Sequence, residues 1–112
     1  MMKVCELYEI EDFQVLNQGE NDQREISVPF CCDLLSIAMG KMPADSAWVT
    51  VMGNINTLAV AALADAACII LAEGSRLDEQ ALLKAREQKL TVLATTRPIF
   101  DAALKVYKGL NA

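Results

Sequence analysis

The residues best suited to contact a ligand lie in three short polar stretches, each of which follows an apolar run. They are Asn54 and Asn56 in the first stretch, Glu73 in the second, and Thr95, Thr96 and Arg97 in the third. Amide, carboxylate, hydroxyl and guanidinium groups form hydrogen bonds and ion pairs, but these residues do not make up a known catalytic motif. The pattern therefore predicts ligand binding rather than bond-making.

Each stretch lies between an expected strand and an expected helix, and the free N–H groups at a helix N-terminus attract anions. An asparagine can cap the helix after the first stretch, and a threonine can cap the helix after the third. Arg76 and Arg97 add positive charge nearby. We therefore expect a site for a small anionic group, such as the phosphate of a nucleotide. The alternative is ordinary helix capping, which every helix needs.

Signals for catalysis are weak. The chain contains no histidine to act as a base near neutral pH. A Walker A loop would need glycine at position 35 and serine or threonine at position 42, where the chain has Leu35 and Met42. Cys31 or Cys32 could act as a nucleophile near a helix N-terminus, which keeps a small thiol enzyme or redox protein as a third hypothesis. We expect a protein that is not an enzyme.

Four cysteines are present, at positions 5, 31, 32 and 68. They form no CxxC pair, so a zinc site would need four cysteines at irregular spacing. The simpler interpretation is that they are small buried hydrophobes in a reducing compartment. We predict no metal site and no cofactor.

The composition excludes several classes of partner. The net charge is −5 over 112 residues, which argues against nucleic-acid binding through phosphate contacts. No run of 18 apolar residues occurs, so no membrane partner is expected. The first six residues lack the apolar core of a signal peptide, and a cytoplasmic location follows. The length suits one domain spanning residues 1–112.

Three apolar runs, at residues 47–52, 68–72 and 90–94, are typical of strands buried on both faces. Expected helices follow the three runs, at residues 55–65, 78–89 and 98–108. This order predicts an α/β domain with a β-α-β-α-β-α core, a mainly parallel sheet and a three-layer-like architecture. Its ligand site is expected outside the carboxyl ends of the strands.

The N-terminal region is less regular. Residues 1–28 are expected to form a short α+β extension, with a helix at 3–10 and strands at 13–16 and 25–28. The α/β core then spans residues 29–112, and the strand at 25–28 lies at an edge of the sheet.

Proline cannot donate a ladder hydrogen bond, so Pro29 is expected to end that edge strand. Residues 31–39 follow as a helix, with Asp33 in its first turn and Gly40 at its end.

The helix expected at 55–65 continues into an alanine-rich sequence, TLAVAALADAA at residues 57–67. A helix that is apolar all round is normally buried all round, which is difficult in a domain of this size. We therefore predict a homodimer whose interface includes Leu58, Ala59, Ala62, Leu63 and Ala66. The alternative is an alanine-rich surface helix that is stable through propensity alone.

Three segments together resemble the DRTGG domain family: CDLLSIAMG at 32–40, AWVTVMGNIN at 47–56 and ADAACIILAEG at 64–74. The resemblance extends over roughly residues 3–108, although the five-letter string that names the family is absent. It implies an α/β fold similar to the N-terminal domain of HPr kinase/phosphorylase. It also implies a regulatory or architectural role and association as dimers. The family offers no catalytic residues to carry over.

These observations favour a non-catalytic regulatory module that forms a homodimer and senses a small anionic metabolite or nucleotide. The alternative is a structural adaptor that docks on a larger enzyme. The resemblance points to hydrogenase- or kinase-associated enzymes, because stand-alone members of the family accompany such genes.

Overall fold

Five strands form one sheet in the computed structural model, which describes residues 1–112. They are β1 (Gln14–Asn17), β2 (Pro29–Cys31), β3 (Ala47–Thr50), β4 (Cys68–Leu71) and β5 (Thr91–Ala94). The spatial order is β1-β5-β4-β3-β2; β2 to β5 are parallel, and β1 pairs with β5 in the antiparallel sense. The predicted, mainly parallel sheet is confirmed.

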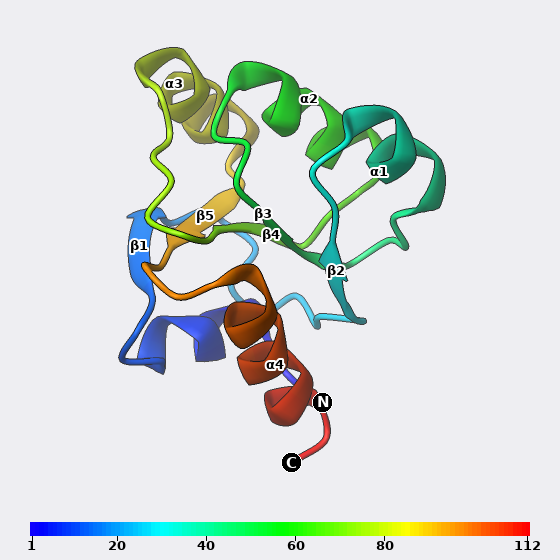
Figure 1. The fold of residues 1–112 in the computed structure, drawn as a ribbon, viewed down its shortest axis with the longest axis vertical. Coiled ribbons are helices and arrows are strands. Elements are labelled where there is room, and N and C mark those ends of the chain that lie inside the picture. The colour runs from blue at the N-terminus through cyan, green and yellow to red at the C-terminus, as the bar shows by residue number, and fades with distance from the viewer.

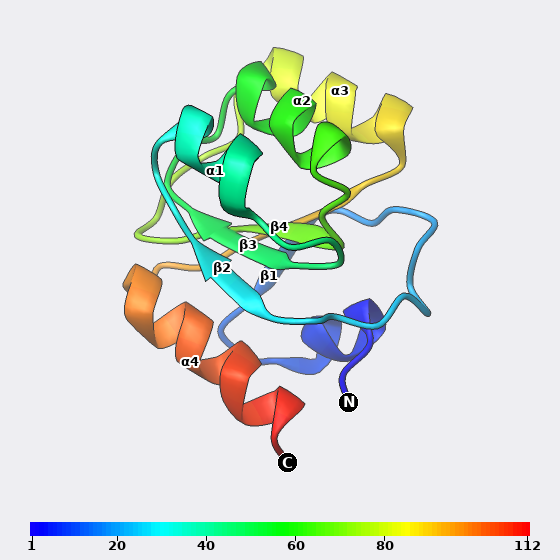
Figure 2. The ribbon, with the colours of Figure 1, turned by 90° about the vertical axis from the view of Figure 1, so that its right-hand side faces the viewer.

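Helices cover both faces of the sheet (Figures 1 and 2). One face carries α1 (Leu35–Lys41), α2 (Ile55–Leu63) and α3 (Glu79–Gln88). The other face carries α4 (Ile99–Leu110) and the 3₁₀ helix η1 (Val4–Glu9). The α/β, three-layer-like architecture is confirmed, and the unit β2-α1 precedes the predicted β-α-β-α-β-α core. No helix is both long and apolar enough to cross a membrane.

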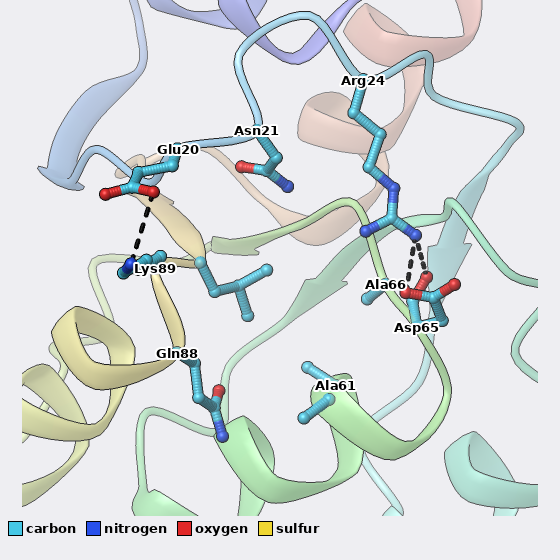
Figure 3. Close-up of a pocket in the computed structure, with 10 residues that line it drawn as sticks. Glu20, Asn21, Arg24, Ala61, Asp65, Ala66, Gln88 and Lys89 are labelled. Atoms are coloured by element: carbon cyan, nitrogen blue, oxygen red, sulfur yellow. Dashed lines mark hydrogen bonds and ion pairs between the residues drawn. The ribbon is translucent and has the colours of Figure 1, made fainter.

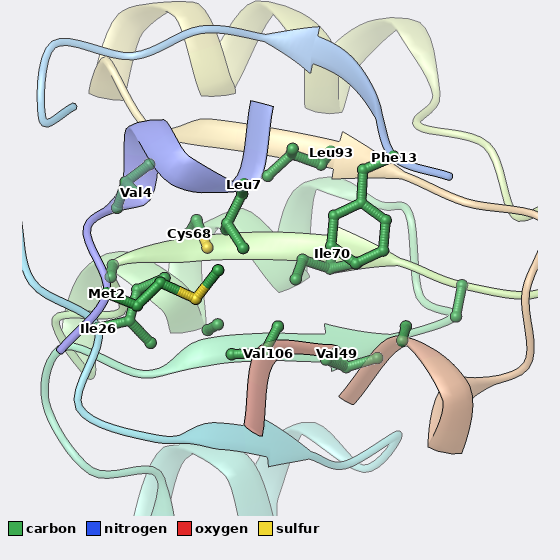
Figure 4. Packing of buried hydrophobic residues seen from close by; sticks show 14 residues of the cluster. Met2, Val4, Leu7, Phe13, Ile26, Val49, Cys68, Ile70, Leu93 and Val106 are labelled. Atoms are coloured by element: carbon green, nitrogen blue, oxygen red, sulfur yellow. The ribbon is translucent and has the colours of Figure 1, made fainter. Parts of the chain in front are cut away.

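The strands are apolar along their whole length because each face contributes to a separate core. Trp48 and Ile69 are register partners that pack under the helices α1 to α3. Their neighbours Val49 and Ile70 point the opposite way, into the cluster between the sheet, η1 and α4 (Figure 4). All four side chains are fully buried. This double coverage explains why the runs lack the polar alternation of a half-exposed sheet.

The edge strand predicted at residues 25–28 is wrong. Strand β2 starts at Pro29, and within 25–28 only Glu25 pairs, through an isolated bridge to Lys3. Proline is tolerated as the first residue of an edge strand, because a missing N–H donor costs little there. Pro29 therefore begins the strand that it was expected to end.

The helix predicted at residues 31–39 starts later, at Leu35. Asp33 is consequently not in its first turn. Its carboxylate instead accepts a 2.7 Å hydrogen bond from the hydroxyl of Thr50, at the end of β3. Gly40 lies inside α1 rather than at its end. The polar contact with β3 explains why the chain stays extended past the cysteines.

Helix α2 lies between α1 and α3 (Figure 2), which accounts for apolar residues all round its axis. Leu58 and Ala66 are buried in the chain's own core. Ala59, Ala62 and Leu63 are exposed. Of the residues predicted to form a dimer interface, only these last three are therefore open to a partner.

Candidate functional site

A cleft of about 440 Å³ opens at the carboxyl ends of β4 and β5, and we call it the carboxyl-end cleft. The chain leaves β4 toward α3 on one face of the sheet and leaves β5 toward α4 on the other (Figure 2). Open α/β sheets bind ligands where such connections diverge. The lining residues are Asp12, Gln14, Leu16, Gly74, Ser75, Arg76, Leu77, Ala94, Thr95 and Thr96.

Two of the predicted ligand residues, Thr95 and Thr96, line this cleft. Thr95 is buried, and its hydroxyl accepts a 3.1 Å hydrogen bond from the main-chain N–H of Arg97. Its carbonyl accepts from the N–H of Gly74, so Thr95 joins the two loops that form the cleft. Neither threonine caps α4: the N-cap residue is Pro98. Thr96 remains exposed and available to a ligand.

Glu73 follows β4 in the left-handed conformation, with φ of 61°. Its carboxylate accepts a 3.5 Å hydrogen bond from the N–H of Ile99, in the first turn of α4. A negative charge is favourable at a helix N-terminus. The chain's own carboxylate therefore holds the helix end at which the sequence predicts an external anion.

The charged groups at the rim are partly paired. Asp12 contacts Arg97 at 3.3 Å and Lys105 at 3.2 Å through the same carboxylate oxygen. The hydrogen bond from Lys105 is the main cause that lowers the pKa of Asp12; desolvation opposes it, and the charge of Arg97 supports it. Arg76 is exposed, lines the cleft and forms no ion pair. Arg76 is thus the cation that a ligand can use.

Asn54 and Asn56 do not line the cleft. The Asn54 side chain accepts hydrogen bonds from the N–H groups of Asn56 and Thr57, which confirms that Asn54 caps α2. The loop supports the cleft indirectly, because the carbonyl of Gly53 accepts a 3.0 Å hydrogen bond from the N–H of Asp78. The three polar stretches therefore do not meet in one cavity.

Two of the four cysteines, Cys31 and Cys68, lie where the thiolate form is disfavoured. Burial raises the pKa of Cys68 to about 12. Burial, and then the charge of Asp33, raise the pKa of Cys31. Both shifts disfavour the reactive thiolate. All four cysteines are free, and no group of three or more metal-binding side chains is placed to hold an ion.

A model of the DRTGG domain family matches residues 6–108. The chain belongs to the DRTGG domain family. No curated protein matches it. Among solved structures it resembles the CBS and DRTGG domains of the regulatory region of Clostridium perfringens pyrophosphatase, which was crystallised with its activator, diadenosine tetraphosphate. The TM-score is 0.66 at 13% identity, covering 80% of this chain and 39% of that one. The chain thus spans about two fifths of that structure.

One wall of the carboxyl-end cleft in this DRTGG domain cannot be predicted from the sequence. Asp12, Gln14 and Leu16 come from the segment around β1, which pairs Gln14 with Ala94 across 80 residues of sequence. The only local signal is the apolar pattern of the strand, and it does not show where the strand pairs. Nothing in the sequence indicates that these residues meet the loops after β4 and β5.

A second cleft, of about 310 Å³, lies at the opposite end of the strands, and we call it the amino-end cleft (Figure 3). None of the residues predicted to bind a ligand lines it. Of the residues predicted for a dimer interface, Ala62 and Ala66 do. Its outer wall, formed by Glu20, Asn21 and Arg24, belongs to the connection between β1 and β2. The full lining is Glu20, Asn21, Arg24, Ala61, Ala62, Asp65, Ala66, Gln88, Lys89 and Leu90.

Proposed function

We propose that this DRTGG domain is a non-catalytic regulatory module that senses a small anionic molecule in the carboxyl-end cleft. The observation that carries the proposal is the position of the cleft at the divergence of the two connections, with the unpaired Arg76 in its wall. A volume of about 440 Å³ lies within the usual range for small-ligand sites.

The charges around the cleft favour an anion. Three cations, Arg76, Arg97 and Lys105, stand in or beside it with two carboxylates, those of Asp12 and Glu73. The chain as a whole has a net charge of −5, so this surplus of positive charge is local. The polyphosphate activator of the pyrophosphatase regulatory region supports an anionic ligand, such as a nucleotide, as the first class to test.

The groups in the chain do not favour catalysis. The chain has no histidine, and the shifted pKa values of Cys31 and Cys68 disfavour their thiolates. Asp12 and Glu73, the carboxylates nearest the cleft, are engaged in contacts within the chain. Thr96, Arg76 and ordered main-chain groups can bind a ligand, but none is an evident base or nucleophile.

The proposal includes homodimerisation through the exposed stripe of α2, formed by Ala59, Ala62 and Leu63. Leu63 is 74% exposed, which is costly to leave in water. The same stripe serves the alternative, an adaptor that docks on a larger enzyme. The proposal treats residues 1–112 as one unit in the cytoplasm, a compartment that keeps its four free cysteines reduced.

A thermal-shift screen with nucleotides and phosphorylated metabolites tests the ligand. A molecule that binds only the folded state raises its stability by an amount that grows with the logarithm of the ligand concentration above the Kd. We expect at least one anion to raise the Tm by several degrees at concentrations about a hundred times its Kd. Arg76→Ala should reduce the shift, because it removes the unpaired cation of the cleft.

Arg86→Ala is the matched control. Arg86 is an exposed arginine of α3 that does not line the cleft, so its removal should leave the ligand shift unchanged. A screen without any stabilising anion would refute the sensor and favour the adaptor. Light scattering tests the dimer separately: a mass near 12.2 kDa at micromolar concentration would contradict it.

A further inference from the structure

Part of the lining of the carboxyl-end cleft is apolar. Leu16 of β1, Leu77 before α3 and Ala94 at the end of β5 line the cleft and also pack against the core beneath α1 to α3. We call these three residues the apolar floor. All three are only partly buried, so they keep surface that a ligand can cover. A ligand with an apolar or aromatic body gains free energy by covering this surface, whereas a purely ionic ligand does not.

The polar side chains around the apolar floor are free to bind. Ser75, Thr96 and Gln14 line the cleft, and their side chains form no hydrogen bond within the chain. Arg76 forms no ion pair, and it is exposed, as are Gln14 and Thr96. The cleft therefore presents a guanidinium group, two hydroxyls and an amide that the fold itself does not use.

The charges of the cleft limit how many phosphate groups it can hold. Arg76 is the one cation of the lining, and the neighbouring cations Arg97 and Lys105 are already paired with Asp12. Asp12 lines the cleft too and brings a negative charge into it. A phosphate monoester carries about −1.5 to −2 charges at pH 7. Arg76 can balance one such group, but each further phosphate would face Asp12 without a cation of its own.

The size of the cleft agrees with this charge argument. Its volume of about 440 Å³ lies near the lower end of the range for small-ligand sites, roughly 300–1,000 Å³. A single nucleoside with one phosphate is a small ligand of this kind. Diadenosine tetraphosphate, the activator in the pyrophosphatase structure, contains two nucleosides and a chain of phosphates, which the charges here do not favour.

We propose that the carboxyl-end cleft binds a nucleoside monophosphate, an inference that rests on the proposed anion site and specifies its ligand. The phosphate accepts hydrogen bonds from the Arg76 guanidinium group and from the hydroxyls of Ser75 and Thr96. The heterocycle covers the apolar floor. The Gln14 amide, which is both donor and acceptor, pairs with the polar edge of the base.

Isothermal titration calorimetry of the whole chain in magnesium-free buffer tests the ligand class. The ligands are the monophosphates and triphosphates of adenosine, guanosine, cytidine and uridine, together with glucose 6-phosphate. We expect at least one monophosphate to bind about tenfold more tightly than its triphosphate, whose added charges face Asp12. The same monophosphate should bind about tenfold more tightly than glucose 6-phosphate, which has no apolar ring to cover the floor.

Two variants test the two ends of the ligand. Thr96→Val removes a hydroxyl that contacts the phosphate, so it should weaken the nucleoside monophosphate and glucose 6-phosphate alike, by about tenfold. Gln14→Ala removes the contact with the base, so it should weaken only the nucleoside monophosphate. Gln80→Ala is the matched control, because Gln80 is an exposed glutamine of α3 outside the cleft. It should bind every ligand as the unmodified chain does.

Several results would overturn the nucleoside monophosphate and leave the anion sensor standing. These are a triphosphate or glucose 6-phosphate that binds as tightly as the best monophosphate, or unchanged nucleoside monophosphate binding by Gln14→Ala or Thr96→Val. Absence of binding by all of these phosphates would also overturn this inference. The anion sensor itself fails only if the wider thermal-shift screen finds no stabilising anion either.

Discussion

The two clefts lie at opposite ends of the same parallel strands, and they differ in which polar group is left without a partner. At the carboxyl end, Arg76 is a cation without a carboxylate partner, and helices begin. At the amino end, Gln88 Oε1 is an acceptor without a donor, and helices finish. All βα units in a parallel sheet point the same way, so their dipoles give each end a different electrostatic character.

The N-terminal extension contributes a wall to both clefts. Asp12, Gln14 and Leu16 border the carboxyl-end cleft, whereas Glu20 and Arg24 border the amino-end cleft. The βα units alone would leave both ends more open. The comparison therefore shows that the extension, which looks peripheral in the sequence, shapes both clefts.

The largest expected loss of stability concerns two glycines beside the clefts, where one main-chain segment approaches another closely. A Cβ atom at Gly53 would overlap the carbonyl of Arg76, and one at Gly19 would overlap the carbonyl of Lys89. Gly53→Ala and Gly19→Ala should each lower the free energy of unfolding by about 1–3 kcal/mol, because the backbone must shift. Urea unfolding measures this loss. Gly40→Ala is the control, since a Cβ there meets nothing.

The next effect compares one arginine from each end. Arg24 is 25% exposed and bonds both Asp45, at 2.6 Å, and Asp65. Its burial lowers its pKa, but the hydrogen bonds and charges of the two aspartates outweigh burial and raise it. Arg24→Ala should cost about 1–3 kcal/mol in urea unfolding, because it leaves two carboxylates close together without their cation.

Arg97 is 52% exposed and contacts only Asp12 among carboxylates. Arg97→Ala should cost less than about 1 kcal/mol, as is usual for exposed ion pairs. Equal losses of unfolding free energy in Arg24→Ala and Arg97→Ala would mean that the ion pairs at the amino end stabilise the fold no more than those at the carboxyl end.

A smaller effect is expected at alkaline pH, where the stability of the region around the amino end should fall. Tyr8 donates a 2.7 Å hydrogen bond to Asp22, in the segment that borders the amino-end cleft. Desolvation is the main cause that raises the pKa of Tyr8 from 10.0 to about 12, and Asp22 adds to it. Neutral Tyr8 therefore contributes stability below pH 10.0 that is lost as the pH rises toward 12. Urea unfolding across this range should show the loss, and Tyr8→Phe should flatten it.

The smallest effect belongs to the carboxyl end at acid pH. The pKa of Asp12 lies below its ordinary value of 3.8, so ionised Asp12 contributes stability above that pH. The contribution is lost as the pH falls through the lowered pKa. Asp12→Asn should make acid unfolding less steep in this range, measured by circular dichroism. Glu11→Gln, a neighbouring exposed carboxylate, is the control and should leave the profile unchanged.

The βα alternation is predictable because its signals are local. The apolar runs at 47–52, 68–72 and 90–94 contain β3, β4 and β5, and Asn54 caps α2 as its residue type suggests. The errors cluster around Pro29 and Asp33, where the backbone conformation depends on partners outside the local segment. Asp33 stays out of the helix because Thr50, 17 residues away, donates to its carboxylate.

The candidate site is less predictable than the fold. Thr95 and Thr96 line the expected cleft. The side chain of Asn54 instead caps α2, and the carboxylate of Glu73 accepts a hydrogen bond from the first turn of α4. A polar residue after a strand can serve a ligand or its own helix, and residue type does not distinguish the two. The hydrogen-bond partner of each side chain decides its role, and the tertiary structure determines that partner.

By itself, the sequence determines that buried strands alternate with helices, because burial on both faces and helix capping leave their marks on neighbouring residues. Only the tertiary structure decides that residues 12–24 return to border both ends of the sheet. This depends on Gln14 pairing with Ala94 and on Arg24 reaching Asp45 and Asp65. Contacts between residues far apart in the chain are selected by the packing of the whole domain, and they leave no periodic pattern in the residues that make them.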